Sequence, residues 1–403
     1  MVLLGCRRWI LDGQCVWRRP CPRSIQARIG MKSFSLFVPR LLLLYAHFFT
    51  MVHFHTAPLP ETNVEPNRKV LTDEQAYQYM MERNKERIRR ATKEETSTTP
   101  YPDPIDISGW KQSSEQRAMI VQEVLEQATT VGSFQIAGHG IDPALFRRID
   151  ESYRAFLADP TKQDYQSDSH FTGYQGPGPE STAAAYGDTD APPDLRELWS
   201  VLNPPSHPKN VAAPEPFQSV VLEYMAAMEG LRSTLFSILA EVVASVKKIH
   251  VTADALEARQ STGLFRCARY LDGSPHPDKL VPHSDFATMT IVHTEHAGLE
   301  EIRDDVWVPV PVRPGVLHVV LSELMHVWTN GLLVNNIHRV RNSGNTDRTR
   351  YLYFCGDVCE EDPRDEGIKP ICAVGEDPLF GKVSLSRHFF HHTRAFFGNV
   401  ETI

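Results

Sequence analysis

The stretch His283-Ser-Asp-Phe-Ala-Thr-Met-Thr290 follows a predicted loop and leads into a predicted strand. In an extended chain, residues i and i+2 point to the same side, so the side chains of His283 and Asp285 can hold one ion between them. Such a pair often arises by chance, and it gains meaning from His338, which ends a predicted strand further along the chain. Two histidines and one carboxylate on one side of a metal leave other coordination positions open, as is typical of non-haem Fe(II) oxygenases. A zinc hydrolase is a weaker interpretation, because the sequence has no His-Glu-x-x-His motif.

A second set of polar residues follows ten positions after His338, in the predicted strand that starts Arg348-Thr-Arg350. The side chains of Arg348 and Arg350 share one face of this strand, and strand pairing can bring Tyr270 close to them. A guanidinium inside a barrel needs a counter-charge, because a buried unpaired ion costs several kcal/mol. A bound dicarboxylate would supply that charge, and arginine would grip it with two hydrogen bonds.

The two halves of the chain differ in their expected secondary structure. The first half is predicted to be largely helical, with a helix capped by Ser113 or Ser114, another that Pro143 opens, and a long one over residues 216–246. The apolar stripe of the helix after Ser114 is expected at Ala118, Val121, Leu125 and Ala128. Short strands follow, punctuated by turns, at 263–270, 288–293, 307–310, 317–321 and 351–355. This pattern predicts a sandwich or jelly roll, mainly β with α.

Composition and expected secondary structure divide the chain into five parts. They are a basic and apolar head at 1–60, a polar and partly helical linker at 61–100, an N-terminal region at 101–215, a long support helix at 216–250, and a jelly-roll core with a C-terminal helix at 251–403. The head contains a run of about a dozen mostly apolar residues, too short for the roughly 20 that span a bilayer. It is either a targeting segment or the product of a mis-assigned start, with Met31 or Met51 as the true one.

Charge and cysteine content limit the partners and the compartment. The net charge of the 403 residues is −8, and the head holds eight basic residues and one acidic residue, so the rest of the chain carries −15. An acidic body argues against nucleic acid as a partner. Seven cysteines without a dense framework indicate reduced thiols, hence a cytoplasmic protein, with an organelle as the alternative if residues 1–60 act as a targeting segment.

From about residue 101 to 392, the chain resembles the isopenicillin-N-synthase-like branch of the Fe(II)/2-oxoglutarate-dependent dioxygenases. The motifs that carry the resemblance, in order, are Pro104-Ile-Asp-Ile-Ser108, Gly132-Ser-Phe-Gln-Ile-Ala-Gly-His-Gly-Ile141, Gly173-Tyr174, Asp194-Leu-Arg-Glu197, His283–Thr290, Gly298-Leu299, Trp307-Val-Pro-Val310, Thr329-Asn-Gly331 and His338-Arg-Val340. Their order and spacing make a chance match not credible.

The resemblance implies a distorted double-stranded β-helix with Fe(2+) bound by His283, Asp285 and His338. It implies that Arg348 binds the distal carboxylate of the co-substrate 2-oxoglutarate, with Tyr270 assisting, and that O2 is the oxidant. The family usually has Arg-x-Ser, but here the serine position is Arg350, and Ala268 stands where an asparagine often precedes the tyrosine. The loss of the hydroxyl removes one hydrogen bond to the carboxylate, worth about 1–3 kcal/mol, while Arg350 supplies a second cation.

We therefore expect an oxygenase that hydroxylates, desaturates or cyclises a small organic metabolite, in the manner of secondary-metabolism enzymes, and that acts as a monomer. Phe286 and Tyr174 are candidates for the substrate pocket. Selectivity is expected in the loop 167–193, near Phe265 and in the C-terminal helix, whose residues Phe389, Phe390, Phe396 and Phe397 are expected to pack on the barrel. Two alternatives stay open: a 2-oxoglutarate-independent oxidase like isopenicillin N synthase, and a non-catalytic binding protein on the same fold.

Overall fold

The computed structural model describes residues 70–91, 100–167, 171–178, 180–188, 190–257, 263–272, 278–341, 348–356 and 367–397. The chain divides into two compact units, residues 1–65 and 66–403, and everything described belongs to the second. The hypotheses about residues 1–60 lie outside the described residues. Within the described part, no helix combines the length and the apolar character that crossing a bilayer requires.

Most of the helices lie in the first half of the described chain. Their bounds are α2 Asp73–Arg90, α3 Ser114–Thr130, α4 Pro143–Ala158, α5 Thr182–Ala185, α6 Phe217–Lys247, α7 Ala253–Glu257, α8 Glu323–Trp328 and α9 Leu385–Phe396, with 3₁₀ turns η1 Ile107–Lys111 and η2 Lys162–Tyr165. The long helix and the helix opened by Pro143 form as predicted.

The strands form two sheets. Their bounds are β1 Ile105–Asp106, β2 Ser133–Ala137, β3 Gly173–Gln175, β4 Arg196–Leu202, β5 Gly263–Tyr270, β6 Asp278–His283, β7 Met289–His293, β8 Leu299–Arg303, β9 Val306–Pro309, β10 Leu317–Leu321, β11 His338–Arg341 and β12 Arg348–Cys355. The large sheet has the order β1-β2-β10-β7-β12-β5-β4-β3, and the small sheet has the order β6-β11-β8-β9. Nearly all neighbouring strands are antiparallel, as the jelly-roll prediction requires.

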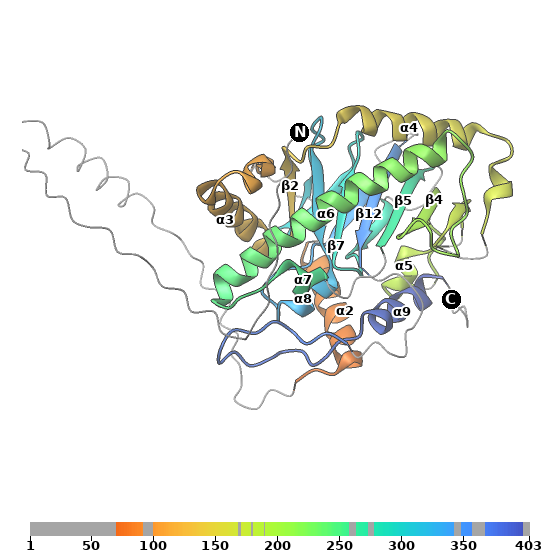
Figure 1. Cartoon of the computed structure of the whole chain (residues 1–403). Helices are drawn as coiled ribbons and strands as arrows, with labels where there is room; N and C mark the ends of the chain where they lie inside the picture. The colour runs from red at the N-terminus through yellow and green to blue at the C-terminus, as the bar shows by residue number, and fades with distance from the viewer. Residues whose placement is uncertain are drawn as a thin grey trace, which may run out of the picture. The chain divides into compact units, whose positions relative to one another are not determined.

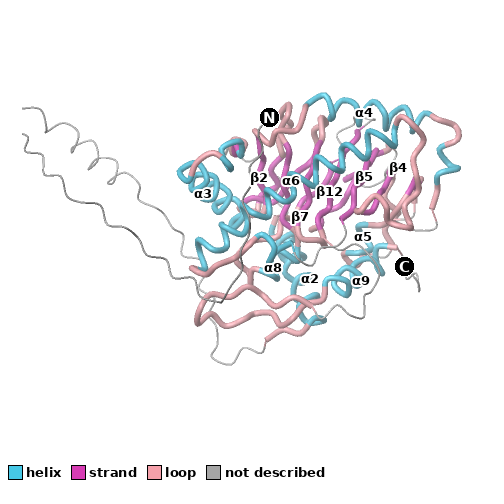
Figure 2. The backbone as a smooth tube through the Cα atoms, viewed as in Figure 1, coloured by secondary structure: helices cyan, strands magenta, loops and turns pink. Residues whose placement is uncertain are grey.

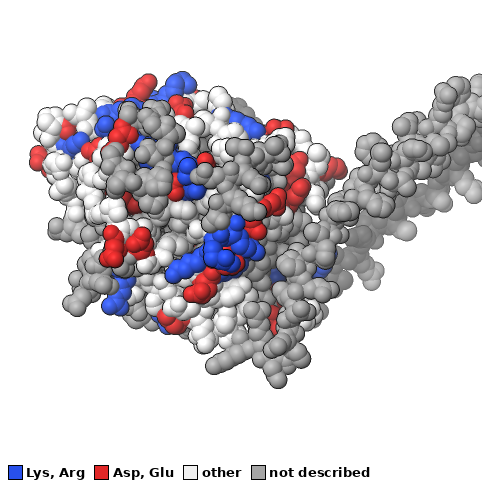
Figure 3. All heavy atoms as spheres, turned by 180° about the vertical axis from the view of Figure 1, so that it is seen from behind, with Lys and Arg blue, Asp and Glu red and all other residues white. Residues whose placement is uncertain are grey.

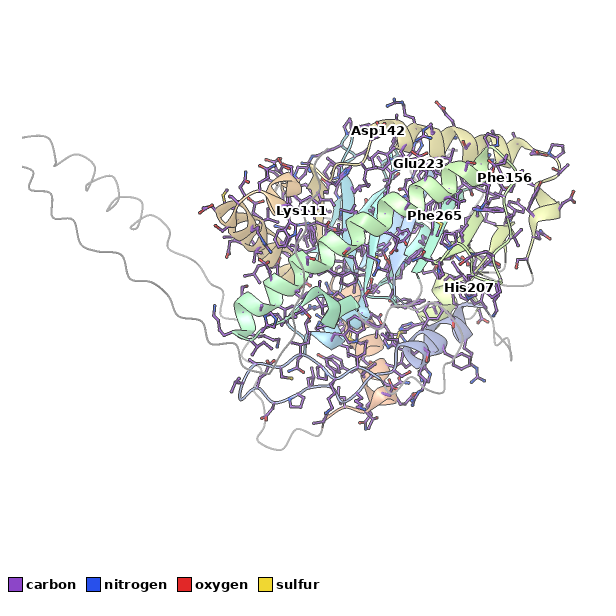
Figure 4. The ribbon with its side chains drawn as sticks, viewed as in Figure 1. Lys111, Asp142, Phe156, His207, Glu223 and Phe265 are labelled. Carbon is purple, nitrogen blue, oxygen red and sulfur yellow. The ribbon has the colours of Figure 1, made fainter. Side chains whose placement is uncertain are left out.

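Helices α4 and α6 lie across one face of the large sheet (Figures 1 and 2). The contact is aromatic: the rings of Tyr224 on α6 and Phe265 on β5 are 4.9 Å apart, and Phe156 of α4 stacks on Phe217 of α6 at 5.2 Å. Figure 4 labels Phe265 beneath α6 and Phe156 near the end of α4. Because this face is closed by helices, the opposite face of the large sheet is the one that can line a cavity with the small sheet.

Three details of the sequence prediction are wrong. The alternating motif Pro104–Ser108 predicts a short strand, but only Ile105 and Asp106 pair with β2, because Asp106 caps the turn η1 that follows. The helix α3 begins after its cap Ser113 as predicted, but it buries a face shifted from the expected stripe, and the residues that this face buries are Ile120, Val124 and Ala128. The segment 167–193, expected to be loop, contains β3 and α5.

Helix α2, from the predicted linker, packs beside α9 at the other end of the chain. Thr72 and Gln75 form a capping box at the start of α2, which satisfies two backbone N–H groups. Asp73 accepts a hydrogen bond from the backbone N–H of Ser384 at 3.1 Å, and His391 lies 3.1 Å from Glu74. These polar contacts hold the two helices together next to α8.

The surface seen from behind in Figure 3 carries acidic and basic side chains close beside one another. Several charged side chains of the described part form ion pairs, such as Arg339 with Glu300 at 2.7 Å and Arg341 with Asp278 at 3.2 Å. This face does not present the uniformly basic surface that phosphate backbones attract.

Candidate metal centre

The small sheet brings together the side chains of His283, Asp285 and His338, at the point where β6 ends and β11 begins. His283 is the last residue of β6, and His338 is the first residue of β11, not the end of a strand as predicted. These two histidines are direct partners in the antiparallel register, so their rings lie side by side with centroids 4.3 Å apart. Asp285 follows two residues after β6, and one donor atom from each of the three side chains lies within 4.8 Å of the others.

The distances in this triad suit an ion held between the side chains. Oδ1 of Asp285 is 3.8 Å from Nε2 of His283 and 3.8 Å from Nε2 of His338, which is too long for a hydrogen bond. Two donors that each bind a metal at about 2.1 Å lie at most about 4.2 Å apart. The donor set therefore fits a divalent cation without rearrangement of the sheet.

Neighbouring groups orient two of the three ligands. Nδ1 of His283 donates to the carbonyl oxygen of Val281 at 2.7 Å, so the proton sits on Nδ1 and Nε2 keeps its lone pair for a metal. The hydroxyl of Thr290 donates to Oδ2 of Asp285 at 2.5 Å, which leaves Oδ1 facing the histidines. The backbone N–H of Glu323 donates to the carbonyl oxygen of Asp285 at 3.1 Å.

Burial sets the charge of the triad. It lowers the pKa of His283 to about 3 and that of His338 to about 3, so both imidazoles are neutral near pH 7. Burial also raises the pKa of Asp285. Neutral imidazoles can donate lone pairs, and a carboxylate that is poorly stabilised by its surroundings gains from a cation.

The triad opens into a cavity of about 110 Å³ between the two sheets and helix α9. The cavity is lined mainly by apolar and aromatic side chains, with a few charged groups among them. Its lining residues are Phe171, Thr182, Arg196, Leu264, Arg266, Tyr270, Leu280, His283, Asp285, Phe286, Ala287, Val292, Leu299, Val320, His338, Val340, Arg350, Leu352, Phe354, Phe389, Thr393 and Phe396.

The two arginines of β12 differ in their surroundings. Arg350 lines the cavity, is 2% exposed, and has no hydrogen-bond partner for Nε and Nη2 among the described residues. Its guanidinium lies 5.5 Å from the ring centre of Tyr270, which also lines the cavity. Arg348 does not line the cavity, and its Nη1 donates to the carbonyl oxygen of Arg341 at 2.8 Å. The position of the usual serine thus places the second cation, Arg350, directly at the site.

A second pair of cavity arginines was missed in the sequence. Arg196 of β4 and Arg266 of β5 share the carboxylate of Glu180, at 2.6 and 3.0 Å, and Arg196 also pairs with Asp194 at 3.1 Å. Arg266 is further bonded to the hydroxyl of Ser200 at 3.1 Å. The available signal was Arg196 within the motif Asp194-Leu-Arg-Glu197, and Arg266 between the apolar residues Phe265 and Cys267 of a predicted strand.

Of the two substrate-pocket candidates, only Phe286 lines the cavity. Tyr174 is 1% exposed and lies outside it, with its ring against Phe156 and its hydroxyl donating to Glu197 at 2.7 Å. Tyr174 is held there because β3 pairs with β4, which turns this side chain toward α4. Phe389 and Phe396, expected to pack on the barrel, line the cavity.

Glu323, His388 and His392 form a second group of possible ligands. Nε2 of His388 and Nε2 of His392 lie 3.0 and 2.8 Å from the same oxygen of Glu323, and these side chains are fully buried. Burial alone would raise the pKa of Glu323, but the histidines outweigh it and lower the pKa to about 2. Hydrogen bonds already satisfy this carboxylate, so the group holds α9 against α8 and needs no ion.

Comparison with known proteins agrees with this geometry. Residues 103–219 match the family described as non-haem dioxygenase in morphine synthesis N-terminal, and residues 263–356 match the 2OG-Fe(II) oxygenase superfamily. The second match spans β5 to β12, which contains the triad and Arg350.

Individual relatives cover most of the described part. Clavatol oxidase from Penicillium crustosum is 29% identical over 316 residues, covering 69% of this chain and 90% of that protein. A 2-oxoglutarate-dependent dioxygenase from Monascus ruber is 25% identical over 312 residues, covering 70% and 91%.

Solved structures share the fold. JOX2 in complex with 2OG, Fe and JA aligns with a TM-score of 0.60 at 21% identity over 76% of this chain and 93% of that chain. The dioxygenase for auxin oxidation from rice aligns with a TM-score of 0.58 at 19% identity over 73% and 95%. These alignments confirm the predicted β-helix core. The two family matches establish that the chain belongs to the 2OG-Fe(II) oxygenase superfamily and is an oxidoreductase that uses Fe(2+), 2-oxoglutarate and O2.

Proposed function

We propose that His283, Asp285 and His338 are the iron ligands of this dioxygenase. The observation that carries the proposal is the convergence of three donor atoms, with the Asp285 oxygen 3.8 Å from both imidazole nitrogens, at the wall of the cavity. The hydrogen bonds from His283 to Val281 and from Thr290 to Asp285 fix the lone pairs toward one point.

Arg350 is the main anchor for the distal carboxylate of 2-oxoglutarate. Its guanidinium is buried beside the triad, without a carboxylate partner among the described residues, and an unpaired buried cation is costly. A carboxylate of the co-substrate would remove this cost with charge-assisted hydrogen bonds. Arg348 lies two residues before Arg350 on the same face of β12. Its Nη2 is also buried without a described partner, so the positive charge of Arg348 adds to the attraction for an anion.

The substrate is a small organic molecule that enters beneath α9. When bound, iron and 2-oxoglutarate supply the activation of O2, in which decarboxylation to succinate and CO2 is coupled to oxidation of the substrate. The chain's part is to orient the reactants and to exclude water. Water is excluded by an apolar wall of the cavity, which the rings of Phe286, Phe389 and Phe396 form.

We further propose a monomer in the cytoplasm. Large hydrophobic side chains that are exposed in the described part are scattered, with Leu222 and Val246 near opposite ends of α6, Met119 on α3, and Val70, Val312 and Val374 outside helices and strands. Scattered exposure of this kind is normal for a surface without a partner. Cys267 and Cys372 are free thiols, which suits a reducing compartment.

The test measures iron binding and co-substrate turnover in the full chain. Under anaerobic conditions, the purified protein is expected to bind one Fe(II), and His283→Ala is expected to lose it. The matched control is His250→Ala, an exposed histidine outside the cavity, which keeps the iron. With O2 and labelled 2-oxoglutarate, the wild type is expected to release succinate slowly even without substrate.

Two results would contradict these assignments. Full iron occupancy in His283→Ala would remove His283 from the metal centre. Consumption of O2 that is independent of 2-oxoglutarate would favour an oxidase that takes all its electrons from the substrate, and Arg350 would then serve another anion.

A further inference from the structure

The cavity is lined by two groups of arginines with different charge balance. The first is the Arg350 guanidinium, which lies 5.5 Å from the ring centre of Tyr270 and whose Nε and Nη2 have no described hydrogen-bond partner. In the second, the two positive charges of Arg196 and Arg266 meet the two negative charges of Glu180 and Asp194 at distances between 2.6 and 3.1 Å. The first group calls for an anion, whereas the second group is already neutral.

The neutral group still has unpaired hydrogen-bond donors. Nε of Arg196 and Nη2 of Arg266 are buried N–H donors without a partner in the described structure, and both side chains line the cavity with exposures of 7% and 5%. A buried donor left unpaired loses stabilisation. An oxygen of a bound molecule would satisfy these donors. An added carboxylate would bring a negative charge to a group that has no spare positive charge, so an uncharged oxygen fits better.

Part of the cavity wall is aromatic. Phe171 lies 5.5 Å from Phe389, ring centre to ring centre, and Phe286 lies 6.3 Å from Phe396 in an edge-to-face pair. The Arg196 guanidinium lies 5.8 Å from the ring centre of Phe396, which joins this aromatic wall to the neutral group. A further aromatic ring can add stacked or edge-to-face contacts to such a wall, which an aliphatic chain cannot make.

We propose that the substrate is an uncharged aromatic molecule whose carbonyl or phenolic oxygen accepts hydrogen bonds from Arg196 and Arg266, while its ring packs between Phe171, Phe286 and Phe389. This inference rests on the proposed function, because the metal centre and Arg350 must serve the iron and the co-substrate. The oxidised carbon is one that this pose presents to the triad. For hydroxylation, a C–H bond, O2 and 2-oxoglutarate give a C–OH group, succinate and CO2.

The experiment compares three probes of similar size on the full chain loaded with Fe(II) and 2-oxoglutarate. They are 2-hydroxyacetophenone, 2-hydroxybenzoate and cyclohexyl methyl ketone, which differ in charge and in aromaticity. Binding is measured anaerobically by calorimetry, and turnover is measured as succinate released above the rate without a probe. We expect 2-hydroxyacetophenone to bind at least tenfold more tightly than the other two probes and to be the one that increases succinate release.

A variant tests the donors themselves. Arg266→Lys keeps the positive charge beside Glu180 but removes the guanidinium donors, so it is expected to weaken binding of 2-hydroxyacetophenone about 10- to 100-fold. The control is Arg148→Lys, an exposed arginine that pairs with Glu223 outside the cavity. Circular dichroism and iron content show whether Arg266→Lys is folded, and the three-probe comparison stands without it.

Each outcome bears on the proposal. Tighter binding of 2-hydroxybenzoate, equal binding of the cyclohexyl ketone, or no binding of any probe overturns it. Unchanged affinity in folded Arg266→Lys overturns the role of the donors. If the proposed function itself fails, the protein binds no iron and releases no succinate even without a probe, so the two failures are distinguishable.

Discussion

Replacement of Arg350 by methionine is expected to weaken 2-oxoglutarate binding while stabilising the ligand-free protein. Methionine keeps much of the side-chain volume but removes the charge. In the wild type, Nε and Nη2 of Arg350 are available to a carboxylate, and hydrogen bonds to charged groups contribute about 1.5–3 kcal/mol each. Arg350→Met loses both of these bonds, and Arg348 can replace part of their free energy. The net loss of binding free energy is then about 2.7–4 kcal/mol, which raises the dissociation constant about 100- to 1000-fold.

The ligand-free protein responds in the opposite direction. Arg350 is 2% exposed and its burial lowers the pKa of the guanidinium, which shows that the charged form is poorly accommodated. Replacement of uncompensated buried charge by an apolar side chain often stabilises a protein by about 1–4 kcal/mol. The free energy of unfolding without 2-oxoglutarate should therefore rise in Arg350→Met.

The assay combines calorimetric titration with 2-oxoglutarate and thermal unfolding with and without it. A ligand present at 100 times its dissociation constant stabilises the folded state by about 2.7 kcal/mol, and a 100-fold weaker ligand at the same concentration does so by only about 0.4 kcal/mol. Arg148→Met, an exposed change beside Glu223, serves as control. The reasoning is refuted if Arg350→Met binds 2-oxoglutarate within threefold of wild type, or if the ligand-free variant is less stable.

Three further predictions concern the metal centre and its support. Thr290→Val removes the hydroxyl that donates to Asp285 and is expected to raise the dissociation constant of the metal about 10- to 100-fold; equal metal affinity in an anaerobic competition titration would contradict this. Glu323→Ala leaves two buried histidines without their acceptor and should lower the free energy of unfolding by about 3–5 kcal/mol. Denaturant titration measures this loss, and a value below about 1 kcal/mol would contradict the role of Glu323 in holding α9 against α8. Because the pKa values of His283 and His338 are about 3 when folded and about 6.5 when unfolded, the unfolded chain binds more protons between these values. In metal-free protein, these two histidines should therefore contribute a loss of stability of up to about 2.7 kcal/mol per pH unit below about pH 6.5. The slope of the free energy of unfolding against pH, measured by denaturant titration, should be shallower in His283→Ala/His338→Ala.

The sequence predicted most of the long elements because each one has a strong local pattern. The helix α6, predicted over residues 216–246, has a continuous apolar stripe, and Val221, Met225 and Leu235 of this stripe are buried. The strands β5 and β10 have the predicted bounds, since apolar runs between turns define them. Strands β4, β6 and β8 were not predicted, because charged residues interrupt their apolar pattern.

For the site, spacing alone was enough to suggest which residues meet, but not how they are surrounded. The i and i+2 positions placed His283 and Asp285 together, and His338 joined them by cross-strand register. Which of the two β12 arginines lines the cavity depends on packing: Arg348 donates a hydrogen bond to the backbone carbonyl of Arg341, and this contact has no sequence signature. The pair Arg196 and Arg266 was missed for the same reason, because Glu180 reaches them from a segment read as loop.

In helix α9, the residues that attach the helix to Glu323 differ from the residues that line the cavity. His388 and His392, four residues apart on one side, bind Glu323, whereas Phe389, Thr393 and Phe396 line the cavity. The lining positions can therefore change without loss of the attachment. Chimaeras that keep the two histidines and exchange the residues between and after them offer a direct route to new substrate preference, and the same division would allow related enzymes to diverge in specificity while keeping one docking mode.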